Sequence, residues 1–144
     1  MICPNTEFIL FVHITMKHRR NKLLEISTGA KSKPVFLRQL LTNLVRNGKI
    51  TTTPKRAAVL KSYADNFFAG LVKNTQTYKD EKDARRENIR VIKSEIFSEP
   101  EGKKVLETLL PKFIEAGKKS GFVTSYKLGY RLGDGAEKIL LKLS

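Results

Sequence analysis

The sequence predicts an α+β fold in which helices pack on one face of a small, mostly antiparallel three-stranded sheet, preceded by an extended basic N-terminal arm. Two periodicities predict this class. Between Pro34 and Gly117 apolar residues recur at helical spacing, whereas Phe122–Leu143 shows β-branched and aromatic residues in strand-like alternation. The third observation is charge, because 28 Lys and Arg residues stand against 14 Asp and Glu residues, for a net charge of +14.

Residues 1–15 form an apolar extension that ends just before a second methionine. The run FILFVHI, from Phe8 to Ile14, is too short for a membrane span, which needs about 20 apolar residues. It lacks the preceding Lys or Arg and the cleavage site of a signal peptide. The sequence favours a start at Met16, with residues 1–15 arising from a start codon assigned too early. A disordered tail, an added strand and a membrane anchor stay open as alternatives.

Residues 16–33 are predicted to form the basic arm. The segment KHRRNKLLEISTGAKSK, which begins at Lys17, contains six Lys and Arg residues and shows no sustained period. This composition favours an extended chain that becomes ordered only when it binds a polyanion.

Residues 34–144 are predicted to form a single domain. Pro34 opens a first helix, and the glycine of position 48 ends it with a left-handed cap. Ile50–Thr52 predicts a short strand, and Thr53 followed by Pro54 predicts the start of a second helix. The apolar faces of these two helices consist of Leu37, Leu40, Leu41, Leu44 and Val45, and of Ala57, Leu60, Ala64, Phe67, Phe68, Leu71 and Val72.

The helical region is predicted to continue with two further helices. After a polar connection at Thr75–Asp83, a third helix spans Ala84–Phe97 with a stripe of isoleucines. Pro100 opens a short fourth helix, which Pro111 is expected to interrupt, and Gly117 ends the helical region.

Two strands complete the predicted sheet. Phe122–Arg131 and Glu137–Leu143 flank a Gly-Asp-Gly turn and therefore predict a β-hairpin. The short strand at Ile50 can pair with this hairpin. Because a two-stranded ribbon is only marginally stable alone, the helices are expected to pack over it.

The positive charge is unevenly distributed and predicts a polyanionic partner. Met16–Lys61 holds twelve basic residues and one acidic residue, Ser62–Glu101 holds seven and eight, and Gly102–Ser144 holds nine and four. Such an excess opposes folding unless a polyanion neutralises it. We expect nucleic acid, ahead of an anionic membrane or an acidic protein, bound mainly through the first of these segments.

The sequence offers no catalytic or metal site. Cys3 is the only cysteine, and neither it nor His13 and His18 belongs to a cluster with zinc spacing. The P-loop, GxGxxG, GxSxG and HExxH motifs are absent. Asp134, in the Gly-Asp-Gly turn, is expected to cap its own backbone. We therefore predict a protein that is not an enzyme and takes no cofactor, metal or small-molecule substrate.

Five segments together carry a likeness to a known family. They are MKHRRN from Met16, FLRQLLTNLVRNGKITTTPKRA from Phe36, LLPKF from Leu109, YKLGYRLGDGA from Tyr126 and KILLKL from Lys138. In this order they resemble the bacterial-type L-seventeen family of large-subunit ribosomal proteins, over about nine-tenths of the chain. Because Thr28, Ser32 and Thr124 depart from the family pattern, no RNA contact is carried over to them.

The resemblance implies a structural constituent of the large ribosomal subunit, cytoplasmic and ribosome-bound, on the outer surface near the nascent-chain exit. The implied partners are large-subunit rRNA and neighbouring large-subunit ribosomal proteins, with no membrane. The residues that match the family in type or charge, together with basic neighbours, form the predicted RNA-binding set: Lys17, His18, Arg19, Arg20, Lys22, Lys31, Lys33, Arg38, Arg46, Thr52, Lys55, Arg56, Lys127 and Arg131.

Two other functions stay open from the sequence. The same basic face could serve a non-ribosomal nucleic-acid-binding regulator, although no base-reading recognition helix is apparent. A membrane-tethered basic protein would use the apolar run at Phe8–Ile14. The pattern does not distinguish a bacterial host from an organelle.

Overall fold

The structure is a computed structural model that describes residues 32–78 and 80–144. The predicted extension at residues 1–15 and nearly all of the predicted arm at 16–33 lie outside these residues. The elements, in chain order, are α1 (Ser32–Asn47), β1 (Lys49–Thr52), α2 (Pro54–Thr77), α3 (Glu81–Glu95), α4 (Glu99–Lys104), the π-helical turn η1 (Val105–Leu109), α5 (Leu110–Glu115), β2 (Val123–Tyr130) and β3 (Glu137–Leu143).

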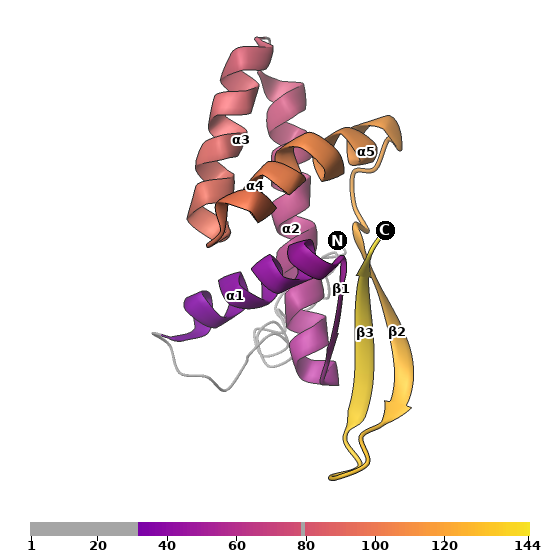
Figure 1. Cartoon of the computed structure of the whole chain (residues 1–144). Coiled ribbons are helices and arrows are strands. Elements are labelled where there is room, and N and C mark those ends of the chain that lie inside the picture. Colours follow the sequence, from indigo (N-terminus) through magenta and orange to yellow (C-terminus); the bar gives the residue numbers. More distant parts are fainter. Residues whose placement is uncertain (1–31, 79) are drawn as a thin grey trace, which may run out of the picture.

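The described elements confirm the predicted α+β class. The three strands form an antiparallel sheet in the order β1-β3-β2, with Ile50 opposite Leu141 and Ser125 opposite the same residue on the other side. Figure 1 shows the helices on one side of this sheet, with α1 crossing α2 and with α3 beside the upper half of α2. The predicted hairpin and its pairing with the short strand at Ile50 are both confirmed.

The first helix and first strand meet at a glycine, as expected. Helix α1 begins at Ser32, two residues before the predicted start at Pro34. Gly48 has φ of 69°, a left-handed conformation that lets the chain turn directly from α1 into β1. The apolar stripe of α1 is buried as predicted, and Leu41 is fully inaccessible to solvent.

Helix α2 is the central element of the domain. Thr53 and Pro54 stand at its start as predicted, although the Thr53 side chain makes no capping hydrogen bond. The predicted polar connection at Thr75–Asp83 is shorter than expected, because α2 continues to Thr77 and α3 begins at Glu81. The two helices are joined here by a 3.1 Å hydrogen bond from Asn74 Nδ2 to Asn88 Oδ1.

The core gathers residues from all parts of the described chain around four phenylalanines. Phe68 packs edge-on against Phe67 and Phe113, with ring centroids 5.2 Å apart in both pairs. Phe122, directly before β2, packs at 4.9 Å against Phe113. Edge-to-face rings stabilise a core beyond the area they bury. This cluster joins α2, α5 and the sheet.

Pro111 does not break the fourth helix as expected. The Leu110 N–H bonds to the carbonyl of Val105, five residues earlier, which is the bond of a π-helical turn. The wider turn relieves the contact that a proline ring makes with the preceding turn, so that helical structure continues from α4 through η1 into α5. Gly102 brings α4 close to α3, because a Cβ there would lie 3.0 Å from Ile92 Cγ2.

Only the start of the hairpin belongs to the core. Val123 and Leu141 are buried, but Tyr126, Leu128 and Tyr130 are all more than half exposed. Figure 1 shows why, because the far end of β2 and β3 extends past the end of α2. The predicted alternation in β2 therefore does not mark a buried face beyond its first residues.

Candidate nucleic-acid interface

An arginine of α1 lies over the ring of an exposed phenylalanine. The guanidinium carbon of Arg38 is 4.3 Å from the ring centroid of Phe97, which follows α3. Phe97 is 52% exposed. Cation–π contacts of this kind are worth about 0.5–1 kcal/mol at exposed sites and favour a position of the guanidinium over the ring. Arg38 is therefore held in a defined orientation at the surface.

A buried threonine connects the backbones of these two residues. Thr42, which is 5% exposed, donates from its hydroxyl to the Arg38 carbonyl at 2.8 Å. The same oxygen accepts the Phe97 N–H at 3.4 Å. The end of α3 is thus joined to α1 at the position where the Arg38 and Phe97 side chains meet.

A second arginine, in α2, lies over an aromatic ring of α1. Arg56, in the first turn of α2, lies with its guanidinium carbon 5.3 Å from the ring centroid of Phe36. Lys55 is adjacent and exposed, and Thr52 precedes it at the end of β1. Lys33 lies in the first turn of α1. The structure therefore brings Thr52, Lys55 and Arg56 together at the junction of β1 and α2.

Arg46 forms contacts within the domain, and its predicted RNA contact stays a prediction. Its Nε–H donates to the carboxylate of Glu101 at 2.5 Å, and its Nη2 lies 3.3 Å from the Ser98 hydroxyl. Lys104 donates to the carbonyls of Val45 and Arg46 and so caps the C-terminus of α1. The hydrogen bond from Arg46 holds the pKa of the Glu101 carboxyl below its usual value. Arg46 thus joins α1 to α4 within the domain.

The two predicted cations of the hairpin also have carboxylate partners. Lys127 Nζ lies 3.1 Å from Glu137, across the two strands. Arg131 donates to Asp134 through Nε at 2.8 Å and through Nη2 at 2.5 Å. The bond from Arg131, with one from the Ala136 N–H, lowers the pKa of Asp134 to about 2. The expected backbone cap by Asp134 is confirmed.

The predicted cations in the described residues therefore fall into two groups. Arg46, Lys127 and Arg131 each form an ion pair. Among residues 32–78 and 80–144, no carboxylate lies in ion-pair contact with Lys33, Arg38, Lys55 or Arg56. Of the predicted cations in the described residues, those without a carboxylate partner all belong to α1 and the first turn of α2.

Comparison with known proteins identifies the family. A family model described as "Ribosomal protein L17" matches residues 36–144. This chain belongs to the L17 family of ribosomal proteins. It is 34% identical over 108 residues to the "Large ribosomal subunit protein bL17" of Clostridium botulinum, covering 75% of this chain and 85% of that protein. The protein of the same name from Fervidobacterium nodosum is 31% identical over 134 residues, covering 89% and 98%. That from Desulforamulus reducens is 32% identical over 118 residues, covering 82% and 93%.

Part of the predicted L17-type interface lies outside the described residues. This part comprises Lys17, His18, Arg19, Arg20, Lys22 and Lys31, and their predicted RNA contacts stay predictions. Within the described ranges, no group of three or more His, Cys, Asp or Glu side chains could hold a metal ion. No helix there has the length and apolar character needed to cross a membrane.

Sequence reasoning on this L17-family chain missed the residues that hold the arginines. Phe97 was assigned to the end of the third helix, whereas α3 stops at Glu95 and leaves Phe97 exposed beside α1. Phe36 and Thr42 carried no signal, because their partners are distant in the chain. The one sequence feature that could have indicated Phe97 is its position as an aromatic residue directly after the isoleucine stripe of the predicted third helix.

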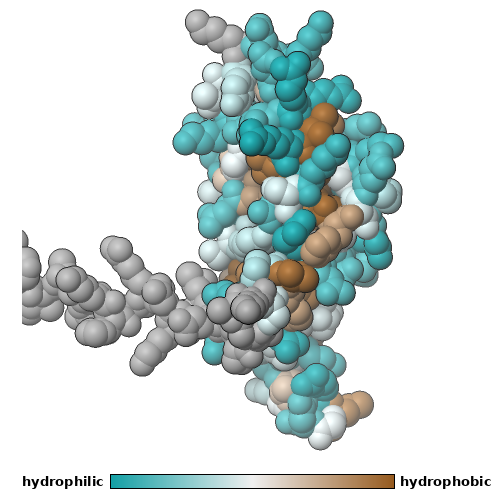
Figure 2. Space-filling model, turned by 90° about the vertical axis from the view of Figure 1, so that its left-hand side faces the viewer, coloured by the Kyte–Doolittle hydropathy of each residue, from teal (hydrophilic) through white to brown (hydrophobic). Residues whose placement is uncertain are grey.

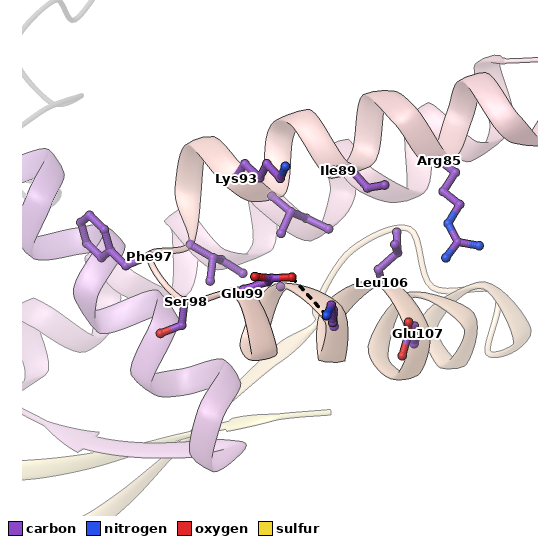
Figure 3. A pocket seen from close by; sticks show the side chains of 12 residues that line it. Arg85, Ile89, Lys93, Phe97, Ser98, Glu99, Leu106 and Glu107 are labelled. Carbon is purple, nitrogen blue, oxygen red and sulfur yellow. Dashed lines mark ion pairs between the residues drawn. The ribbon is translucent and has the colours of Figure 1, made fainter.

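A groove lies next to Phe97 on the helical side of the domain. It has a volume of about 480 Å³ and runs between α3 and the helical segment α4–η1. Phe97 lies at one end and Arg85 with Glu107 at the other, and Ile89 and Leu106 line it between them (Figure 3). Lys103 and Glu99 form an ion pair 3.1 Å long at its rim. Figure 2 shows apolar surface on the helical part of the molecule, bordered by hydrophilic side chains.

Proposed function

We propose that this chain is a structural constituent of the large ribosomal subunit and that it binds large-subunit rRNA through its basic arm and the basic face of α1 and the α2 start. The observation that carries the proposal is the family match over residues 36–144. The relatives at 31–34% identity are named as large-subunit ribosomal proteins.

The charge of the chain supports RNA as the ligand. A net charge of +14 on 144 residues favours a polyanion, and Lys and Arg gain affinity for RNA by releasing its counterions. Arg38 and Arg56 add geometry to this attraction, because each guanidinium lies over an aromatic ring and has no ion-pair partner among the described residues. Planar guanidinium groups bind phosphate through two parallel hydrogen bonds.

The proposal gives the two parts of the chain different tasks. The arm at residues 16–33 threads between RNA helices, and the domain docks its α1 face on the RNA surface. No catalytic step is required. The protein acts by fixing the positions of RNA segments and of neighbouring large-subunit proteins, at the outer surface near the nascent-chain exit.

Sedimentation tests the assignment. The full chain should migrate with the large subunit in a sucrose gradient. The logarithm of its binding constant for large-subunit rRNA should fall linearly with the logarithm of salt concentration. Recovery only from ribosome-free fractions would contradict the proposal. Preferential binding of duplex DNA over rRNA would favour the regulator instead. Cross-linking to a stalled nascent chain tests the location at the exit.

A paired set of variants tests the proposed face. R38E/R56E should lose most rRNA binding, whereas R86E/R90E, which makes the same charge change on exposed arginines of α3, should lose much less. Equal losses for the two double variants would mean that total charge, and not the α1 face, determines binding.

A further inference from the structure

We propose that Arg38 and Phe97 together form a stacking site for an unpaired nucleobase of RNA. This inference rests on the proposed function, since it names the part of the RNA that one patch of the basic face recognises. The ligand is a base in a loop, bulge or single strand, because bases in duplex RNA are already stacked on their neighbours.

The exposure of Phe97 is the first step. Phe97 is 52% exposed, so part of its apolar ring lies in water. The nearby residues Ile92 and Ile96 are buried in the core instead. The Phe97 ring does not fill the core. Instead the guanidinium carbon of Arg38 lies over it, 4.3 Å from the ring centroid. An arginine plane on an aromatic ring extends the flat surface on which a base can stack.

The construction of the pair is the second step. Thr42 is 5% exposed and makes hydrogen bonds to the backbones of both Arg38 and Phe97. The bond from Phe97 joins the residue pair after α3 to the middle of α1, 55 residues earlier in the chain. A surface contact between two mobile side chains needs no such support, whereas a recognition site gains affinity from being held in its binding geometry before the ligand arrives.

The hydrogen bonding of Arg38 is the third step. Its Nε is buried and has no hydrogen-bond partner in the described residues, and no carboxylate forms an ion pair with the guanidinium. An arginine that served only to stabilise the domain would be expected to pair with an acid, as Arg46 does with Glu101. Arg38 thus keeps its charge available, and the proposed base stacks on the pair while the adjoining phosphate meets the guanidinium edge.

The test measures binding of the full chain to in vitro-transcribed large-subunit rRNA. F97A should weaken binding about 10-fold, in the range that stacking of one base contributes, without changing the slope of affinity against salt. R38K keeps the charge but removes the planar group and should give a similar loss with the same slope. I114A is the control, because Ile114 is similarly exposed, at 47%, but belongs to α5 and not to the proposed α1 face.

The stack can also be observed directly. The chain contains no tryptophan, so F97W introduces a single tryptophan, which can be excited selectively over the four tyrosines. Its fluorescence should be quenched when rRNA binds, and that of I114W, on α5, should not. T42V removes both hydrogen bonds of the Thr42 hydroxyl and should weaken binding, whereas T42S keeps the hydroxyl and should restore binding. Melting curves of each variant show whether the domain remains folded.

The outcomes separate the two proposals. If the unaltered chain fails to bind rRNA, the proposed function is overturned and this inference with it. If the unaltered chain binds, but F97A matches I114A within two-fold or F97W is not quenched in the complex, only the stacking site is overturned. A loss for R38K without a loss for F97A would mean that Arg38 contacts phosphate alone, which also overturns it.

Discussion

The carboxylate of Glu101 accepts a 2.5 Å hydrogen bond from Arg46, 55 residues earlier in the chain. Glu101 is only 7% exposed, and its second oxygen is buried without a partner in the described residues. A buried carboxylate is tolerated when it is paired, and removing its partner leaves an uncompensated charge. This bond is therefore a condition for docking α4 against α1.

The Glu101 pair makes the domain sensitive to acid. Its folded-state pKa is lowered below the ordinary value of 4.5, first by the bond from Arg46. A lowered pKa contributes stability that is present above the unfolded-state pKa and is lost as pH falls through the folded-state value. The melting temperature of the wild type should exceed that of E101Q at pH 7, and the two should converge below pH 4.5. E107Q, at an exposed glutamate of η1, is the control and should keep the wild-type profile.

The pKa of Tyr63 is shifted in the opposite direction to that of Glu101, so its contribution to stability is lost at high pH instead of low pH. Its hydroxyl donates to Glu95, and burial, followed by this bond, raises its pKa well above 10.0. A raised pKa contributes stability below the unfolded-state value that is lost as pH rises further. Unfolding by urea should therefore become easier above pH 10 in the wild type. Y63F should lose less of its free energy of unfolding over the same pH range. Identical profiles above pH 10 for Y63F and the wild type would show that Tyr63 is not the source of the alkaline loss.

A core substitution at Leu41 of α1 should be costly. It is fully buried in the main cluster, so L41A should lower the free energy of unfolding by about 2–5 kcal/mol. V35A, on the exposed side of the same helix, should change it by no more than about 0.5 kcal/mol. Denaturant titration of both variants measures the difference.

The arm should contribute to binding but not to the stability of the domain. R19E/R20E is expected to reduce incorporation into the large subunit and the salt dependence of rRNA binding. The melting temperature of the free protein should stay unchanged. A marked drop in melting temperature would mean that this part of the arm packs on the domain.

Local patterns predicted most of the fold. The helical period of α1 and α2 and the Gly-Asp-Gly turn between β2 and β3 are written in neighbouring residues, and both predictions are confirmed. Pro111 was misjudged because its effect depends on the π-helical turn before it. The boundary at Thr75–Asp83 was misjudged because a contact between α2 and α3 extends both helices.

The candidate site was less accessible to sequence reasoning. The basic residues could be selected by charge and by family resemblance, but their partners could not. Nothing near Arg46 in the chain indicates Glu101, and nothing near Arg38 indicates Phe97. Only the folded chain separates the cations that stabilise the domain from those that remain free to bind.

The central position of β3 has a consequence for the order of events during synthesis. Within the described chain, β1 and β2 have no strand partner other than β3, which follows both of them. While a polypeptide is being made, residues 49–52 and 123–130 must therefore wait without a sheet until Glu137–Leu143 has emerged. A chain interrupted before this strand should retain helical structure but no sheet, so the sheet closes only after every helix of the described chain has been made.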